Sequence, residues 1–139
     1  MLNRFHLAIP VNDLNKTVKF YVNNLGCSLG RYCDKWCDLN FFGHQVTLHL
    51  KPDEVKEISK NQVENCQVPV RHFGIILDMN NWHNLKNKLI NKQIDFIVKP
   101  QTRFKGTVGE QAIMFFYDPS FNALEFKAFD KDEMIFRAN

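Results

Sequence analysis

Apolar and polar positions along this chain follow one order of periodicities that occurs twice. Alternation of apolar and polar residues predicts strands, and apolar residues three or four positions apart predict helices. In the first half the pattern predicts a strand at 5–11, a helix from Leu14 to Leu25 that ends at Gly26, and strands at 28–36, 37–42 and 45–50. In the second half it predicts a strand at 72–77, a helix at 80–92, and strands at 96–99, 111–117 and 122–129. The repeated unit is a βαβββ module, used twice.

Each predicted module has one helix for a mostly antiparallel sheet of four strands. One helix covers one face of such a sheet, so the other face is available for a partner sheet or a ligand. We therefore expect an α+β fold whose curved sheet forms a cleft, with the helices on the outer face. The two modules, at about 1–66 and 70–129, are expected to form a single domain with a C-terminal tail at 130–139. The polar, lysine-rich stretch 51–68 is interpreted as a connector with a short helix that starts at Pro52.

Composition restricts the class of protein. A chain of 139 residues with 45% apolar and 24% charged residues is typical of one packed domain. The net charge of +3 comes from scattered basic residues, so nucleic acid and anionic membranes are not favoured as partners. No apolar stretch resembles a membrane span or a signal peptide, which predicts a cytoplasmic protein whose four cysteines are free thiols.

Four residues of metal-binding type lie on the strand faces that the predicted helices leave uncovered. Alternate strand residues share a face, and His6 and His72 point away from the apolar side of the first strand of their modules. By the same alternation, His49 and Glu125 occupy the corresponding face of the last strands. Three imidazoles and one carboxylate suit iron, nickel, zinc, manganese or cobalt, and leave an octahedral ion two positions for water or substrate. The pattern predicts a catalytic metal site, in which His49 is either a ligand or an acid or base beside the metal.

Other side chains are candidates for substrate binding. The predicted loop at 101–109 carries Arg103 and Lys105, which could bind an anionic substrate. Phe115 could shape an aromatic pocket together with Phe42 and Phe104. His44 and Glu110 are further candidates for the mouth of the site, and His83 is interpreted as a surface residue.

Several short motifs, in order along the chain, carry a resemblance to a known superfamily. They are Phe-His-Leu-Ala-Ile-Pro-Val-Asn-Asp-Leu from residue 5, Phe-Tyr at 20–21, Leu-Gly at 25–26, Gly-His-Gln at 43–45, His-Phe-Gly at 72–74, and Asp-Pro-Ser-Phe-Asn-Ala-Leu-Glu-Phe-Lys from 118. With these motifs the sequence resembles the vicinal oxygen chelate superfamily. That superfamily includes glyoxalase I, extradiol dioxygenases, fosfomycin-resistance transferases and bleomycin-resistance proteins.

The resemblance implies two βαβββ modules around a divalent metal, with His6, His72 and Glu125 as a set of two histidines and one carboxylate. His49 falls where glyoxalase I has a fourth ligand. Phe121 departs from the family pattern, because the turn after Asp-Pro-Ser usually carries glycine there and a bulky residue with positive φ is strained. Either this turn differs, or Phe121 is exposed for packing against a partner.

The resemblance also implies a strategy in which a metal chelates two adjacent oxygens of a small-molecule substrate. We expect a dioxygenase with Fe2+ held by His6, His72 and Glu125, and with His49 as a proton carrier. A glyoxalase I-like isomerase or lyase would use all four residues to hold Ni2+, Zn2+ or Mn2+, with Glu125 moving a proton. The alternative from another class is a bleomycin-resistance-type protein that binds a small molecule without catalysis. In each case a homodimer is expected.

Overall fold

The computed structural model describes residues 2–138, which form two compact units. The first unit contains the chain up to Glu57 together with the turn Asp118–Asn122. The second unit contains Ile58–Tyr117 and the chain from Ala123 onward. Each unit is built around one βαβββ module, so the predicted α+β fold is confirmed.

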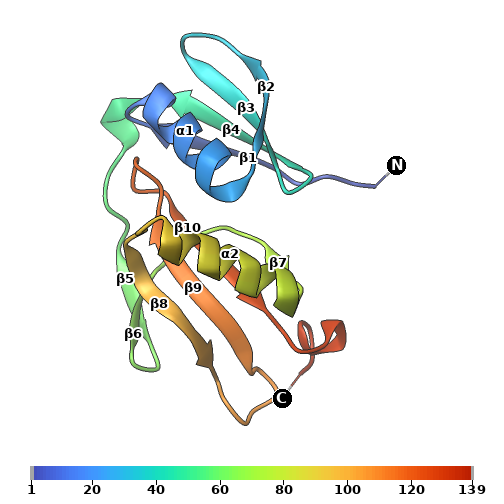
Figure 1. The fold of residues 1–139 in the computed structure, drawn as a ribbon. Helices are drawn as coiled ribbons and strands as arrows, with labels where there is room; N and C mark the ends of the chain where they lie inside the picture. Colours follow the sequence, from blue (N-terminus) through green and yellow to red (C-terminus); the bar gives the residue numbers. More distant parts are fainter. Residues whose placement is uncertain (1, 139) are drawn as a thin grey trace. The chain divides into compact units, whose positions relative to one another are not determined.

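The first unit contains a four-stranded sheet and one α-helix (Figure 1). Its elements are β1 (His6–Val11), α1 (Leu14–Leu25), β2 (Ser28–Tyr32), β3 (Trp36–Phe41), β4 (His44–Leu50) and the short 3-10 helix η1 (Pro52–Glu54). The strand order is β1-β4-β3-β2, with β1 parallel to β4 and the other neighbours antiparallel. The parallel pair places the first and last strands of the module side by side.

The second unit repeats this topology and adds a hairpin (Figure 1). Its elements are β5 (Lys60–Val63), β6 (Cys66–Pro69), β7 (Ile76–Leu77), α2 (Met79–Asn91), β8 (Phe96–Arg103), β9 (Gln111–Tyr117), β10 (Ala123–Ala128) and the 3-10 helix η2 (Asp132–Met134). The sheet order is β7-β10-β9-β8, again with the first strand parallel to the last. Strands β5 and β6 form a separate antiparallel hairpin.

Both α-helices begin at capping residues that the sequence supplies. The Asp13 carboxylate accepts a hydrogen bond from the Lys16 backbone N–H at 2.9 Å, and Asp78 accepts one from Asn81 at 2.8 Å. Helix α1 ends at Gly26, whose φ of 71° is the left-handed conformation that glycine adopts without strain. These contacts explain why the predicted helix limits lie within one residue of those observed.

In the first unit, the strand expected at 28–36 ends at Tyr32, and Trp36 belongs to β3. Three elements of the second unit also differ from the prediction. The expected strand at 72–77 is reduced to β7 and an isolated parallel bridge between Phe73 and Leu124. The expected connector contains the hairpin β5–β6, whose few apolar residues were obscured by polar neighbours. Strand β8 runs on to Arg103, so this residue lies at the end of a strand and the loop begins after it.

The hairpin β5–β6 packs on the sheet of the second unit through Val68. This side chain joins a buried cluster with Val98, Ile113 and Phe115. All three partners lie on the sheet face opposite α2, because Trp82 of α2 lines a pocket with Ala112 and Ala128 and alternate residues of β9 point to opposite faces. The hairpin therefore covers part of the face that a single helix leaves open.

The turn Asp118–Asn122 is tied to α1 through the buried Asp118 carboxylate. Its oxygens accept hydrogen bonds from the Tyr21 hydroxyl at 2.9 Å, from the Ser120 backbone and from both N–H groups of Asn122. Burial raises the pKa of Asp118, and these donated hydrogen bonds oppose that rise. Within this turn Phe121 has a φ of 60° and is 45% exposed, so the turn retains the left-handed conformation that usually favours glycine.

None of the helices formed by residues 2–138 is long and apolar enough to cross a membrane. All four cysteines are free thiols, of which Cys27 and Cys37 are buried.

The hydroxyl of Tyr21 is expected to stabilise the first unit. Tyr21→Phe leaves Asp118 buried with one donor fewer, which should lower the free energy of unfolding by about 1–3 kcal/mol. Burial beside Asp118 raises the pKa of Tyr21 well above 10, so the unfolded chain loses this proton first as the pH rises. Tyr21 therefore stabilises the folded state below pH 10, and this contribution is lost as the pH rises from there towards the raised pKa of the folded state. Tyr21→Phe should not show that loss.

Urea unfolding followed by tryptophan fluorescence at neutral and alkaline pH measures both effects. Tyr32→Phe is the matched control, because Tyr32 is 71% exposed and its hydroxyl is expected to contribute little. Equal stabilities for the two variants would contradict the role given to the Tyr21 hydroxyl.

Candidate functional site

His72 and Glu125 form a close pair in the second unit. The His72 Nε2 atom lies 3.1 Å from Glu125 Oε2, and the Glu125 side chain is only 6% exposed. Two backbone hydrogen bonds hold their segments together, from Phe73 to the Ala123 carbonyl and from Glu125 to the Phe73 carbonyl. The sequence-predicted residues His72 and Glu125 are therefore brought together by the parallel bridge next to β10.

Gly74 makes this close approach possible. A Cβ atom built at Gly74 would lie 1.6 Å from the carbonyl oxygen of Glu125, a distance that no side chain tolerates. Any larger residue would therefore push the segment that carries His72 away from β10. Gly74 was not singled out from the sequence as a site residue, although it stands in the His-Phe-Gly motif.

The imidazole of His72 is held in a defined orientation. Its Nδ1 atom lies 2.8 Å from the carbonyl oxygen of Pro69, and because a carbonyl only accepts, Nδ1 donates the hydrogen bond. The Nε2 atom is thus the one directed at Glu125. The hydrogen bond with Glu125 raises the pKa of His72, and partial burial opposes this.

The His72 imidazole and the Glu125 carboxylate fit a divalent metal ion. Glu125 Oε1 is buried and has no hydrogen-bond partner, while Oε2 lies 3.6 Å from the Lys127 ammonium. A buried carboxylate oxygen without a partner is costly, and a cation would supply what it lacks. An imidazole nitrogen fixed through a backbone carbonyl, next to a carboxylate, is a common arrangement for iron or zinc. Residues 2–138 contain no group of three or more His, Cys, Asp or Glu side chains placed to hold an ion.

Phe115 and Arg103 lie on the same sheet face as this pair. Phe115 is level with Glu125 across β9 and β10, and its ring meets the His72 ring edge-on at 5.0 Å. The Arg103 guanidinium carbon lies 5.7 Å from the centre of the Phe115 ring, and Arg103 is only 7% exposed. Lys105 is exposed in the following loop. The loop position predicted for Arg103 is wrong, because β8 extends to this residue.

His6 and His49 lie in the first unit, where the register of β1 and β4 fixes their spacing. His6 is level with Gln45, whereas His49 is level with Pro10, and all four share one face. The two histidines are therefore four residues apart along parallel strands, or about 13 Å at 3.3 Å per residue. Ligand nitrogens lie about 2 Å from a bound ion, so this spacing favours a ligand set that contains only one of the two.

Asp38 is a buried carboxylate on this same face that sequence analysis missed. Its oxygens accept hydrogen bonds from Thr47 at 2.6 Å and from Gln45 at 3.4 Å, and Arg31 lies 3.6 Å away. The signal was available, since Asp38 stands between apolar Cys37 and Leu39 in a predicted strand. Its partners satisfy the carboxylate, which indicates a structural role in the sheet.

The remaining candidates have other surroundings. His44 accepts a hydrogen bond from the Phe5 backbone at 3.0 Å through Nδ1, and Phe42 is 38% exposed at the turn after β3. Phe104 lies 5.9 Å from the Arg103 guanidinium, and Glu110 accepts a hydrogen bond from the Gly106 backbone.

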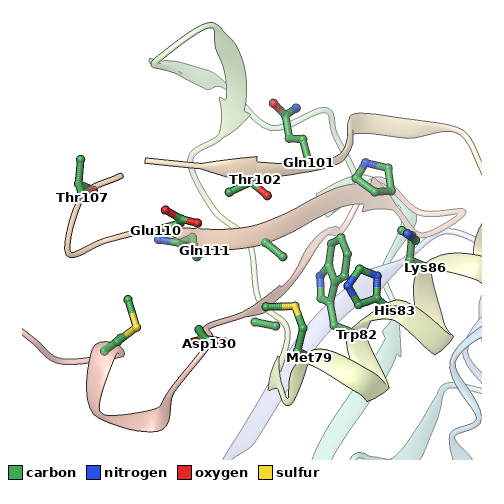
Figure 2. Close-up of a pocket in the computed structure, with 14 residues that line it drawn as sticks. Met79, Trp82, His83, Lys86, Gln101, Thr102, Thr107, Glu110, Gln111 and Asp130 are labelled. Atoms are coloured by element: carbon green, nitrogen blue, oxygen red, sulfur yellow. The ribbon is translucent and has the colours of Figure 1, made fainter. Parts of the chain in front are cut away.

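A pocket of about 520 Å3 lies on the opposite face of the sheet, beside α2 (Figure 2). Trp82 and His83 of α2 line it, together with Glu110 and with Gln111 of β9. Neither His72 nor Glu125 lines this pocket. Its volume alone therefore does not locate the candidate metal site, which is defined by ligand chemistry on the other face.

Comparison with known proteins identifies the family. Residues 4–126 match the family model of the Glyoxalase/Bleomycin resistance protein/Dioxygenase superfamily. A crystal structure of a glyoxalase/bleomycin resistance protein/dioxygenase from Alicyclobacillus acidocaldarius is 38% identical in sequence, with a TM-score of 0.83 and 96% of each chain covered. The chain belongs to this superfamily.

More distant structures share the fold. The fosfomycin resistance protein FosX from Listeria monocytogenes is 16% identical, with a TM-score of 0.71 over 96% of this chain and 98% of that chain. Lactoylglutathione lyase from Agrobacterium tumefaciens is 15% identical, with a TM-score of 0.66 over 92% of this chain and 94% of that chain. A search among curated proteins found no match.

The close approach at Gly74 is expected to control the His72–Glu125 pair. Gly74→Ala should separate the two side chains and weaken binding of a divalent ion by about 10–100-fold, the range for residues that position ligands. Isothermal titration with Mn2+ measures the affinity, and circular dichroism checks that the chain folds. Gly109→Ala is the matched control, since a Cβ there meets nothing closer than 3.7 Å. Equal Mn2+ affinity in the folded Gly74→Ala variant would show that the close approach does not position the pair.

Proposed function

We propose that this protein is a metal-dependent enzyme that chelates two adjacent oxygens of a small substrate, in the manner of a dioxygenase. The observation that carries the proposal is the His72–Glu125 pair, with its fixed imidazole and its unpartnered buried carboxylate oxygen. Membership of the superfamily supports the same chemistry. His6 is proposed as the third protein ligand, as the strand pattern and the family motifs suggest.

Two histidines and one carboxylate form the ligand set typical of non-haem Fe(II) oxygenases. The distance along the strands between His6 and His49 favours this three-residue set over the four-residue set of a glyoxalase I-like isomerase or lyase. Fe2+ is therefore the preferred cofactor, with Ni2+, Zn2+ and Mn2+ as alternatives. Such an ion supplies positive charge that orients the substrate oxygens and stabilises negative charge on them.

The residues of the chain prepare the site for this ion. Pro69 holds the His72 ring so that Nε2 is presented, and the Lys127 ammonium lies 3.6 Å from Glu125 Oε2. Phe115 packs against the His72 ring and excludes water from one side of the pair. His49 has an exposed imidazole and is proposed to carry a proton to or from the substrate.

Arg103, Lys105 and Phe115 are proposed to contact the substrate. Phe115 and Arg103 lie near the ligand pair, whereas Lys105 would contribute from the loop. The homodimer and the cytoplasmic location stay predictions.

Removal of a ligand tests the proposal. His72→Ala should lower the affinity for Fe2+ by more than the roughly 100-fold expected for a residue that only positions a ligand. The metal stabilises only the folded state, so added Fe2+ should raise the melting temperature of the wild type and not that of the variant. Anaerobic calorimetric titration and metal analysis of the purified protein measure these effects, and His6→Ala should behave in the same way.

His83→Ala is the matched control, because His83 is an exposed histidine that lines the pocket on the other face. Equal metal content in wild type and His72→Ala would refute the assignment. Absence of a stoichiometric metal from the wild type, with no response to added ions, would favour the alternative of a non-catalytic binding protein.

His49 separates the two enzyme hypotheses. If three residues hold the metal, His49→Ala should change Fe2+ affinity less than tenfold, while turnover of a catechol falls about 10²–10⁴-fold. If four residues hold it, His49→Ala should weaken metal binding as much as His72→Ala does. Parallel titration of both variants, with oxygen uptake on a panel of catechols, distinguishes these results. Unchanged metal affinity and unchanged turnover would remove His49 from the site.

A further inference from the structure

Arg103 places a positive charge inside the second unit. It is the last residue of β8 and is 7% exposed. Its Nη2 nitrogen is buried and has no hydrogen-bond partner. The contacts of the guanidinium are with the rings of Phe115 and Phe104, at 5.7 and 5.9 Å from its carbon atom.

This position is unfavourable for folding by itself. A guanidinium group stays protonated at every pH that a protein survives, so it cannot escape burial by losing its charge. Ring faces attract a cation, but they do not accept the in-plane hydrogen bonds that a guanidinium offers. The nearby Glu125 does not provide these acceptors, since its Oε2 atom faces His72 and Lys127 and its Oε1 atom has no hydrogen-bond partner.

The guanidinium lies on the side of the sheet that carries the candidate metal ligands. Arg103 is level with Gln111, and Phe115 is level with Glu125, so the alternation of β9 puts these side chains on one face. The Phe115 ring contacts the Arg103 guanidinium on one side and the His72 ring on another. The single ring of Phe115 thus lies between the side chains of Arg103 and His72 and contacts both.

We propose that Arg103 binds an anionic oxygen group of the substrate, a carboxylate or a phosphate-like group. The planar guanidinium offers two parallel N–H groups to such an anion and gains most where water is excluded. The assignment that the other end of the same molecule lies at His72 and Glu125 rests on the proposed function. The substrate class that follows is a small acid. Its two adjacent oxygens would lie at the metal ligands and its anionic group at Arg103, separated by about the width of the Phe115 ring.

Thermal unfolding with two simple anions tests this. Inorganic phosphate and acetate serve as probes at constant ionic strength, on the full chain, once with Mn2+ and once with a chelator. Either anion should raise the melting temperature of the wild type and have no specific effect on Arg103→Met. A larger effect of phosphate identifies a phosphate-like group, and a larger effect of acetate identifies a carboxylate. Without any anion, Arg103→Met should unfold about 2–4 °C above the wild type, because an uncompensated buried charge has been removed.

Lys99→Met is the matched control, since it removes one positive charge from an exposed position of the same strand and should keep the anion response. If Arg103→Met does not fold, Arg103→Lys keeps the charge without the planar fork and should bind the anion about tenfold more weakly. No response of the wild type to either anion, or an equal response in Arg103→Met, overturns the proposal.

The test of anion binding at Arg103 can be separated from the test of metal binding at His72. His72→Ala should lose metal binding and keep the anion response, whereas Arg103→Met should lose the anion response and keep metal binding. Failure of the first expectation alone counts against the metal site, and failure of the second counts against the anion site.

Discussion

Parallel pairing between the first and last strands of each module is the constraint on which the candidate site depends. Parallel neighbours cannot be joined by a tight hairpin, so each module needs a helix and two intervening strands to bring its ends together. In the second unit this pairing is reduced to β7 and the bridge at Phe73, and Gly74 lets the backbones meet. As a result, His72 and Glu125 face each other although most of the module separates them in sequence.

Near the His72–Glu125 pair, the second unit buries charged side chains, which is unfavourable for folding by itself. Glu125 has one carboxylate oxygen near a lysine and a histidine and another without a partner, and Arg103 is buried against aromatic rings. Local rules of protein stability are usually broken at sites where a ligand later satisfies them. The first unit gives the contrast, because the carboxylates of Asp38 and Asp118 have all their bonds within the chain.

The sequence was sufficient for most of the fold and for part of the site. Helix limits followed from Asp13, Asp78 and Gly26, because capping depends on local chemistry. The hairpin β5–β6 was missed, since its stability comes from Val68 packing on distant strands and not from its own pattern. Strand alternation assigned His72 and Glu125 to the face that the helix leaves uncovered, and their separation of 3.1 Å comes from the pairing beside β10.

Properties that depend on strand register could not be predicted in the same way. Alternation assigns His6 and His49 to one face, but the distance between them depends on how far β1 slides along β4. The burial of Arg103 likewise depends on where β8 ends, which the basic composition of the following loop concealed.

The carbonyl of Pro69 connects the hairpin β5–β6 to the imidazole of His72, and this connection makes the two thermodynamically linked. Opening of the hairpin would release the ring from the orientation that presents Nε2. Linkage is reciprocal, so any cation that prefers the presented ring also stabilises the closed hairpin by the same free energy. A segment that contributes no ligand of its own would thus exchange its amide hydrogens more slowly whenever the ion is bound.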